Sequence, residues 1–338
     1  MFQRTPSAVG RRDNRPIAAD FADAFEPGWQ RERMENFQAV LQGVPVGTDL
    51  VDDGWTHDWA RATATPFDPN WTMEDYARRV EEIDFEIMEA HRRRIEETVD
   101  DPATAEILKP YYRYPCKRPL FHDEFLLAFN RPNVEIVDCP AGIDRITETG
   151  LIANGREYEV DCIVFATGFE AENTPAPRRV GHDIVGRDGV TLAERWADGP
   201  RTLHGAMSRG FPNMFFMPCP FQQGAVTANH ALAALEAAEH LGHVVEGLAA
   251  RGVAVFEVGE AAEDEWCAKF AGRPMGMGDF QAECTPSRIN NEGDPGGMNP
   301  LAGNYPDFFK FAQRLAEWRD GGFPGLELIM GDGTEERA

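Results

Sequence analysis

The sequence predicts an α/β fold with doubly wound, Rossmann-like parts and a helical insertion. Three observations predict it: an apolar run that ends in a small-residue turn at 161–168, a second apolar run followed by a turn and a helical pattern at 214–248, and an amphipathic helix at 72–99. Strands that alternate with helices are typical of α/β domains with parallel sheets.

The first apolar run predicts a buried strand. Cys162–Phe165 are continuously apolar, which is typical of a parallel strand covered on both faces. The strand would end at three small residues that leave its carboxyl end uncluttered: Ala166, Thr167 and Gly168. Nucleotides dock at this edge in open α/β sheets, although an ordinary tight turn after a core strand would look the same.

The second run, Met214–Met217, predicts another strand. The turn after it contains Gln222, Gln223 and Gly224, and a helix carrying Leu232 to Leu248 follows. A helix start after a glycine-bearing turn can bind an anion or a polar ligand. An ordinary α/β connection explains the same pattern, so both interpretations stay open.

Two further elements have local signals. Thr72 and Asp75 have capping-box spacing, and the apolar residues that follow recur at helical intervals, so a helix is predicted through Val99. We expect its Arg92–Arg94 triplet to form a solvated face. Asn154-Gly155, between two short alternating segments, predicts a type I′ hairpin.

Composition excludes several classes of function. The 338 residues carry a net charge of −24 and are 42% hydrophobic, which predicts a folded protein with an acidic surface. Such a surface repels phosphate backbones, so nucleic acid and anionic membranes are not expected as partners. A transmembrane helix is not expected either, because the sequence has no apolar stretch of sufficient length.

The six cysteines have neither CxxC pairs nor a framework spacing, which favours reduced thiols and a cytoplasmic location. The amino-terminal residues lack the apolar centre of a signal peptide. The sequence contains no GxGxxG, HExxH or GxSxG motif and no Cys/His metal cluster, so no metal site is predicted.

Two basic pairs could bind anions. An arginine beside a hydroxyl residue, as at Arg4 and Thr5, suits a phosphate monoester. The adjacent cations Lys117 and Arg118 could supply one charge to a phosphate and one to a reacting oxyanion. Either pair, considered alone, is usually just surface basicity.

Taken together, these features resemble the Baeyer–Villiger monooxygenases, flavoproteins related to cyclohexanone, phenylacetone and steroid monooxygenases. The matching stretches follow the order found in that family: Phe2–Pro6, Cys116–Pro119, Phe129–Val134, Asp161–Phe169, Leu192–Trp196, Gly210–Asn213, Cys284–Pro286 and Asn291–Gly293. The resemblance implies an enzyme that uses FAD and NADPH to insert one oxygen atom of O2 beside a ketone carbonyl.

The resemblance also implies residue roles. Arg4, Thr5 and Lys117 match the family's residues for the 2′-phosphate of NADPH, and Arg118 matches its active-site arginine. Ala166, Thr167 and Gly168 match the turn where the chain returns from the NADPH domain to the FAD domain. Gln222, Gln223 and Gly224 match the helix start that closes the flavin ring. Thr285-Pro286-Ser287 departs from the tryptophan that several relatives place near this point.

The implied organisation has two parts. Residues 1–168 would be the remainder of an NADPH-binding domain with a helical insertion at about 20–110. Residues 169–338 would be the carboxyl-terminal share of an FAD-binding domain with a substrate-side loop at 272–304. Both glycine fingerprints of the family are missing, so we expect the carboxyl-terminal portion of such an enzyme. A truncated non-catalytic remnant, or one half of a split enzyme that needs an amino-terminal partner, are the alternatives.

Overall fold

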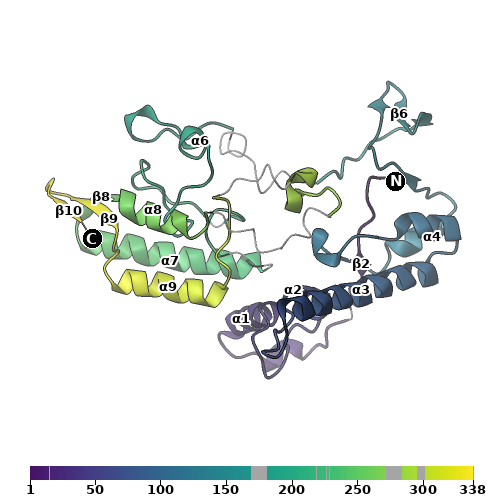
Figure 1. Cartoon of the computed structure of the whole chain (residues 1–338), viewed down its shortest axis with the longest axis horizontal. Helices are drawn as coiled ribbons and strands as arrows, with labels where there is room; N and C mark the ends of the chain where they lie inside the picture. Colours follow the sequence, from purple (N-terminus) through teal and green to yellow (C-terminus); the bar gives the residue numbers. More distant parts are fainter. Residues whose placement is uncertain are drawn as a thin grey trace. The chain divides into compact units, whose positions relative to one another are not determined.

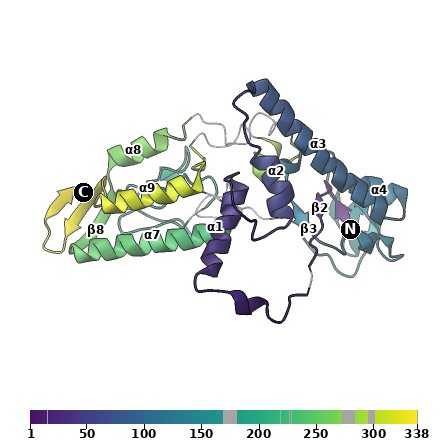
Figure 2. The same ribbon diagram turned by 90° about the horizontal axis from the view of Figure 1, so that it is seen from below.

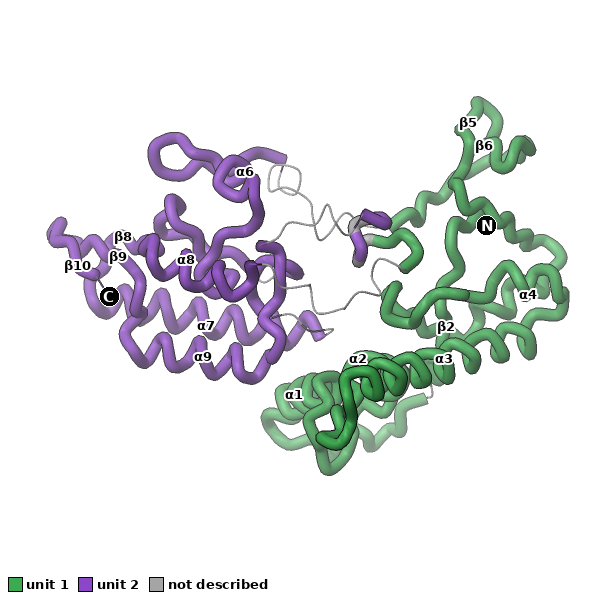
Figure 3. Tube along the Cα trace, in the orientation of Figure 1, with its two compact units in different colours: residues 1–169, 284–289 green, residues 170–283, 290–338 purple. Residues whose placement is uncertain are grey.

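The structure is a computed structural model that describes residues 1–14, 16–168, 181–217, 219–225, 227, 229–271, 284–294 and 301–337. The chain forms two compact units (Figure 3). Unit 1 comprises Met1–Phe169 with Cys284–Ile289, and unit 2 comprises Glu170–Glu283 with Asn290–Ala338. A short segment from late in the sequence thus belongs to the amino-terminal unit.

The longest helix of unit 1 is α3, Met73–Thr98, as predicted. Its capping box is formed: Thr72 Oγ1 accepts a hydrogen bond from Asp75 N, and the Asp75 carboxylate accepts one from Thr72 N. Ile83 and Ile87 pack on one of the unit's apolar clusters. Figures 1 and 2 both show α4 beside the end of α3. The other α-helices of the unit are α1 Trp29–Leu41, α2 Ala60–Thr63 and α4 Pro102–Leu108.

The strands of unit 1 are short. Two parallel ladders pair β1 (Phe2–Gln3) with β4 (Val137–Asp138), and β2 (Val9–Gly10) with β3 (Leu120–Phe121). An antiparallel sheet contains β5 Arg145–Ile146, β6 Gly150–Ala153 and β7 Arg156–Glu159. The hairpin between β6 and β7 is confirmed, because Asn154 and Gly155 both have the positive φ (52° and 73°) that a type I′ turn requires.

The predicted strand at 161–168 is not formed. Among the residues that the structure describes, no strand pairs with this run, and Val164 and Phe165 are 83% and 65% exposed. A parallel strand depends on neighbours along both edges and on cover over both faces. The apolar composition of the run is therefore not sufficient to bury it.

Unit 2 packs helices against an antiparallel sheet. Helices α7 (His230–Ala250) and α9 (Phe308–Asp320) run side by side in both views (Figures 1 and 2). The sheet order is β10-β9-β8, and the remaining helices are short. The bounds are α6 Leu192–Arg195, β8 Val253–Val258, α8 Glu260–Ala268, β9 Leu326–Met330 and β10 Glu335–Arg337. Its core contains Val244, Leu248, Trp266, Trp318, Leu326 and Leu328.

The α/β class is confirmed, although the described residues form short ladders rather than a doubly wound sheet. Met214–Met217 is a coil segment and not the predicted strand. Phe216 N donates to Ala206 O, and the Phe215 ring stacks on Phe256, so this apolar run packs without joining a ladder. No helix in the described part of the chain is both long and apolar enough to cross a membrane.

The arginine triplet on α3 is not a uniformly solvated face. Arg93 is exposed as predicted, but the Arg94 guanidinium donates to Val9 O and His122 O, and Arg92 donates to Pro110 O at 2.8 Å. Arg94 therefore ties α3 to the β2 strand and to the residue that follows β3.

We predict that Arg94→Met destabilises the protein by about 1.5–3 kcal/mol, because it removes charge-assisted hydrogen bonds to two carbonyls. The matched change Arg93→Met, at an exposed neighbour, should stay within about 0.5 kcal/mol. Urea unfolding of both variants measures the difference. Equal losses in the free energy of unfolding would show that the hydrogen bonds of Arg94 do not stabilise the protein.

Candidate functional site

Residues 284–287 return to unit 1 and lie beside the predicted phosphate-binding residues. Arg4 Nη2 donates to Pro286 O at 3.0 Å, and Thr5 Oγ1 lies 3.3 Å from Thr285 Oγ1. Thr5 is half-buried and Arg4 is exposed. The structure therefore places the Arg4-Thr5 pair against a segment that is distant in sequence.

A disulfide bond joins the same segment to the second predicted pair. Cys116, which precedes Lys117, is bonded to Cys284, with Cα atoms 5.3 Å apart. Ser287 Oγ also donates to Cys116 O at 3.0 Å. The expectation that all six cysteines are reduced is therefore wrong for this pair. The other four cysteines are outside this disulfide and are thiols: Cys139, Cys162, Cys219 and Cys267.

Lys117 and Arg118 extend toward different aromatic rings. Lys117 Nζ lies 6.0 Å from the ring centre of Tyr112, whereas Arg118 Cζ lies 4.9 Å from that of Trp55. The Lys117 side chain is half-buried and Arg118 is exposed. Adjacent residues on an extended backbone point to opposite sides, so the two charges can serve different groups.

Tyr112 connects the lysine to the chain after β1. Its hydroxyl donates to Pro6 O at 2.9 Å and accepts from Ala8 N at 3.1 Å. Burial raises the pKa of Tyr112, so the hydroxyl keeps its proton for this bond. The ring under Lys117 is thus fixed to the segment that carries Arg4 and Thr5.

The structure therefore brings Arg4, Thr5 and Cys116 to one segment, with Lys117 and Arg118 following Cys116 in the chain. A guanidinium, a hydroxyl and an ammonium group together form a donor set that fits a phosphate monoester. Sequence reasoning missed four contributors to this place: Trp55, Tyr112, Cys284 and Ser287. Linear spacing could not have found Trp55, Cys284 and Ser287, since each lies far along the chain from the residue it contacts. Tyr112 is close in sequence to Lys117, but its bonds to Pro6 and Ala8 are long-range.

Ala166, Thr167 and Gly168 are exposed. Gly168 has φ of 102°, a left-handed conformation that favours glycine. No described contact links this turn to the Arg4 and Lys117 region, so its predicted role stays a prediction.

The turn at Gln222–Gly224 lies in unit 2 and is not the start of a helix. Helix α7 begins at His230, capped by the Asn229 side chain, which accepts from Leu232 N. Asparagine is a preferred N-cap, whereas the turn at Gln222–Gly224 includes Gln223 with φ of 69°. The prediction of a helix start at this turn is therefore wrong by several residues.

Both glutamine side chains are bonded inside the protein. Gln223 is fully buried; its Oε1 accepts from Thr202 N and Oγ1, and its Nε2 donates to Pro200 O at 2.7 Å and Leu301 O at 3.2 Å. Gln222 Nε2 donates to Gly205 O at 2.9 Å. These amides hold the turn in place.

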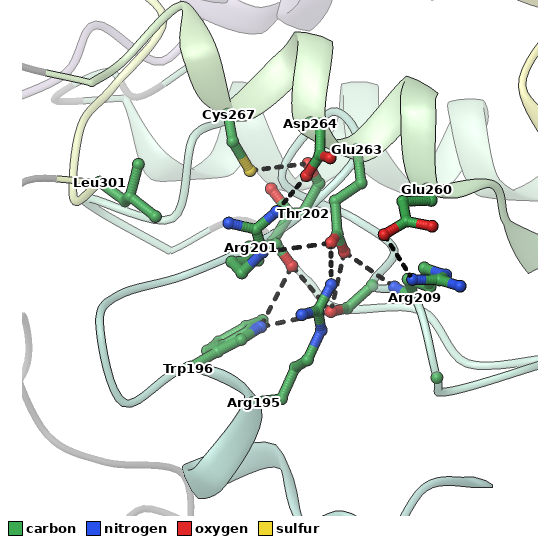
Figure 4. Close-up of polar contacts among 12 residues, drawn as sticks. Arg195, Trp196, Arg201, Thr202, Arg209, Glu260, Glu263, Asp264, Cys267 and Leu301 are labelled. Atoms are coloured by element: carbon green, nitrogen blue, oxygen red, sulfur yellow. Dashed lines mark hydrogen bonds and ion pairs between the residues drawn. The ribbon is translucent and has the colours of Figure 1, made fainter.

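Helix α8, whose Trp266 Nε1 donates to Gln223 O, also carries a buried carboxylate, Glu263 (Figure 4). Glu263, on α8, is 0% exposed and receives hydrogen bonds from the Arg195 guanidinium, from Arg209 N at 2.9 Å and from Ser208 Oγ at 3.4 Å. Arg201 adds an ion pair at 3.4 Å and a further bond to Asp264. A charge this deeply buried is tolerated because it is paired and hydrogen-bonded.

We predict that Glu263→Gln lowers the free energy of unfolding by about 3 kcal/mol, because the partly buried Arg195 guanidinium loses its carboxylate partner and Arg201 is left with Asp264. The matched control is Glu260→Gln on the same helix, where a 68% exposed carboxylate pairs with Arg209. That change should cost less than about 1 kcal/mol. Denaturant unfolding of the two variants would contradict this prediction if the losses were equal.

A small cavity of about 40 Å³ borders the same turn in unit 2, between α7 and α9. Its lining includes Gly224, His204 and His240. Burial lowers the pKa of His204 to about 3 and that of His240 to about 4, so both rings are neutral near pH 7. Arg319 Nη1 lies 2.7 Å from His240 Nδ1; a guanidinium can only donate, so this nitrogen is the unprotonated one.

These two histidines predict a pH dependence of stability. Their folded pKa values lie below the unfolded value of about 6.5, so the unfolded chain binds more protons and stability falls as pH drops from about 6.5 toward 4. As the pH falls from 7.5 to 5.5, each histidine should lower the free energy of unfolding by about 1.4 kcal/mol. His240→Gln should reduce this loss and the exposed His182→Gln should not. If wild type and His240→Gln showed the same dependence of the free energy of unfolding on pH, measured by urea unfolding, this prediction would be contradicted.

Asp49, Asp52 and His57 in unit 1 are close enough to share a cation, with ligand atoms within 4.8 Å of one another. His57 Nε2 lies 2.8 Å from Asp52 Oδ1, and Asp49 Oδ1 accepts from two backbone amides. Asp52 and His57 are exposed and the carboxylates already have partners, so we assign no metal to this group.

No model of a known protein family matches the chain. Comparison with individual proteins nevertheless places it in a family. The chain is 46% identical to pentalenolactone D synthase from Streptomyces exfoliatus, over 97% of this chain and 57% of the relative. It is 39% identical to Baeyer–Villiger monooxygenase ATR8 from Stachybotrys chlorohalonatus, over 95% of this chain and 52% of the relative.

A solved structure agrees with these relatives. The polycyclic ketone monooxygenase of Thermothelomyces thermophila matches with a TM-score of 0.83 and 34% identity, over 97% of this chain and 55% of that one. The chain belongs to the Baeyer–Villiger monooxygenase family. It spans about half the length of the curated relatives that it matches.

Proposed function

We propose that the chain acts in a Baeyer–Villiger monooxygenase that uses NADPH, FAD and O2 to insert one oxygen atom beside the carbonyl of a small-molecule ketone. The family supports the reaction class, and relatives named for FAD binding or solved with FAD and NADP support the cofactors. The single observation that carries the proposal on this chain is the convergence of Arg4, Thr5 and Cys116, the residue before Lys117, on residues 284–287.

The donor set at this place fits the 2′-phosphate of NADPH. Arg4 can present two parallel N–H groups, Lys117 adds a second positive charge, and the Thr5 hydroxyl adds a short donor. Arg4 and Lys117 would neutralise the phosphate dianion, while Thr5 would orient it. In a protein with net charge −24, this local cluster of cations gives an anion a defined place to bind.

Arg118 is proposed as the catalytic residue. When bound, NADPH and FAD supply the reducing electrons and the activation of oxygen. The part of this chain is to place a permanent positive charge where negative charge develops on oxygen during the insertion. Trp55 lies under the guanidinium and restricts its orientation, which lowers the cost of arranging that charge.

The turn at Gln222–Gly224 is proposed to support the flavin ring through its backbone. Both glutamine amides are already bonded to the protein, so the turn offers a fixed shape rather than free amide groups. Ala166, Thr167 and Gly168 are proposed as the crossing between the NADPH-binding and FAD-binding parts. Neither a non-catalytic remnant nor a separate amino-terminal partner is favoured by any contact or relative, and we do not propose them.

We predict that the chain binds adenosine 2′,5′-bisphosphate, which carries the phosphate that distinguishes NADPH, more tightly than 5′-AMP. Arg4→Ala and Lys117→Ala should each weaken this binding about tenfold, because each removes one charge-assisted contact. Arg156→Ala, at an exposed arginine of β7, is the control. Calorimetry that shows equal affinity for the two nucleotides would contradict the assignment.

A further inference from the structure

Among the contacts that attach residues 284–287 to unit 1, four involve the predicted phosphate-binding residues or their neighbour Cys116. Three are hydrogen bonds: Arg4 to Pro286 O, Thr5 to Thr285, and Ser287 to Cys116 O. The fourth is the Cys116–Cys284 disulfide. Lys117 follows Cys116 directly, so this covalent bond lies one residue from a proposed phosphate ligand and two from the proposed catalytic arginine.

The hydrogen bonds alone are weak for this task. The contact of Arg4 is exposed, and the pair of threonine hydroxyls is separated by 3.3 Å, a long distance for an O–H···O bond. Fixing the backbone of four residues costs conformational entropy that a few such bonds do not recover. The two half-cystines, by contrast, are buried, at 1% and 7% exposure.

We propose that the Cys116–Cys284 disulfide is a positioning device for the NADPH 2′-phosphate site and makes the affinity of that site depend on redox state. This inference rests on the proposed function. With the bond intact, Pro286 O orients the Arg4 guanidinium, and Thr285 orients the Thr5 hydroxyl. Without it, residues 284–287 separate from unit 1 and both donors lose the contact that directs them.

The redox step requires a dithiol reductant. A thiolate of the dithiol attacks one sulfur of the disulfide and breaks the S–S bond, forming a mixed disulfide and releasing one protein thiolate. The second thiol of the dithiol resolves the mixed disulfide. Two electrons and two protons pass to Cys116 and Cys284, which become thiols, while the dithiol becomes a cyclic disulfide. Because both sulfurs are buried, we expect slow exchange.

The test begins with the covalent state of the full chain. In denaturant without reductant, a thiol reagent should count four free cysteines, and six after treatment with dithiothreitol. Trypsin should cut after Arg288 about tenfold faster in reduced protein and in the Cys116→Ser/Cys284→Ser variant. The free, exposed Cys162→Ser should behave as wild type. Six thiols before reduction, or unchanged cleavage after it, would overturn the proposal.

The affinity measurement separates positioning from folding. Reduction and the double variant should each weaken the binding of adenosine 2′,5′-bisphosphate about tenfold and leave that of 5′-AMP unchanged. If Arg4→Ala weakens the bisphosphate but reduction does not, the disulfide has no positioning role and the phosphate assignment stands. If Arg4→Ala has no effect, the phosphate assignment fails, and so does the positioning role that rests on it.

Discussion

Loops in this protein must find hydrogen-bond partners without a large sheet to supply them. Buried backbone groups that stay unpaired cost free energy, and only short ladders are available in the described part of the chain. Buried side chains meet this constraint. Gln223 and Glu263 bond the loops of unit 2, and Asp84 of α3 accepts from Tyr114 N at 2.7 Å in unit 1. Burial raises the pKa of Asp84, although the Tyr114 bond opposes that shift.

The candidate site depends on this solution. Arg4, Thr5 and Lys117 lie just outside short strands or turns, where the backbone alone fixes little. Tyr112, Ser287 and the disulfide connect these stretches to one another. The site is therefore held together by bonds between distant segments, and it does not lie on a long helix or strand. A few charged side chains would bind the ligand, and uncharged neighbours hold the backbone around them in place.

Elements with local causes could be predicted from the sequence. Helix α3 carries its capping box and its apolar interval within its own residues, and the hairpin at Asn154-Gly155 needs only two residues with positive φ. The apolar runs at 161–168 and 214–217 are different. A strand exists only through partners, so the same composition can pack as coil, as Phe215 does on Phe256, or remain exposed, as Val164 does.

The candidate site was predictable in part for the same reason. An arginine beside a threonine, and a lysine beside an arginine, can be recognised from the sequence as pairs that could bind an anion. Their contact with residues 284–287 cannot be predicted in this way, because Cys116 and Cys284 are 168 residues apart and lack a framework spacing. The turn at Gln222–Gly224 suggested a ligand because a helix was expected to start there. In the structure the helix begins at His230, and the two glutamine amides bond to Gly205, Pro200 and Leu301.

The cross-link between Cys116 and Cys284 also changes what a break in the backbone does. Residues 117–283 lie between the two bonded cysteines, so the chain forms a covalent ring with two tails. A single cut anywhere in that ring opens it but leaves every residue connected. Such a nicked molecule stays in one covalently connected piece until a reductant breaks the disulfide and separates the two parts.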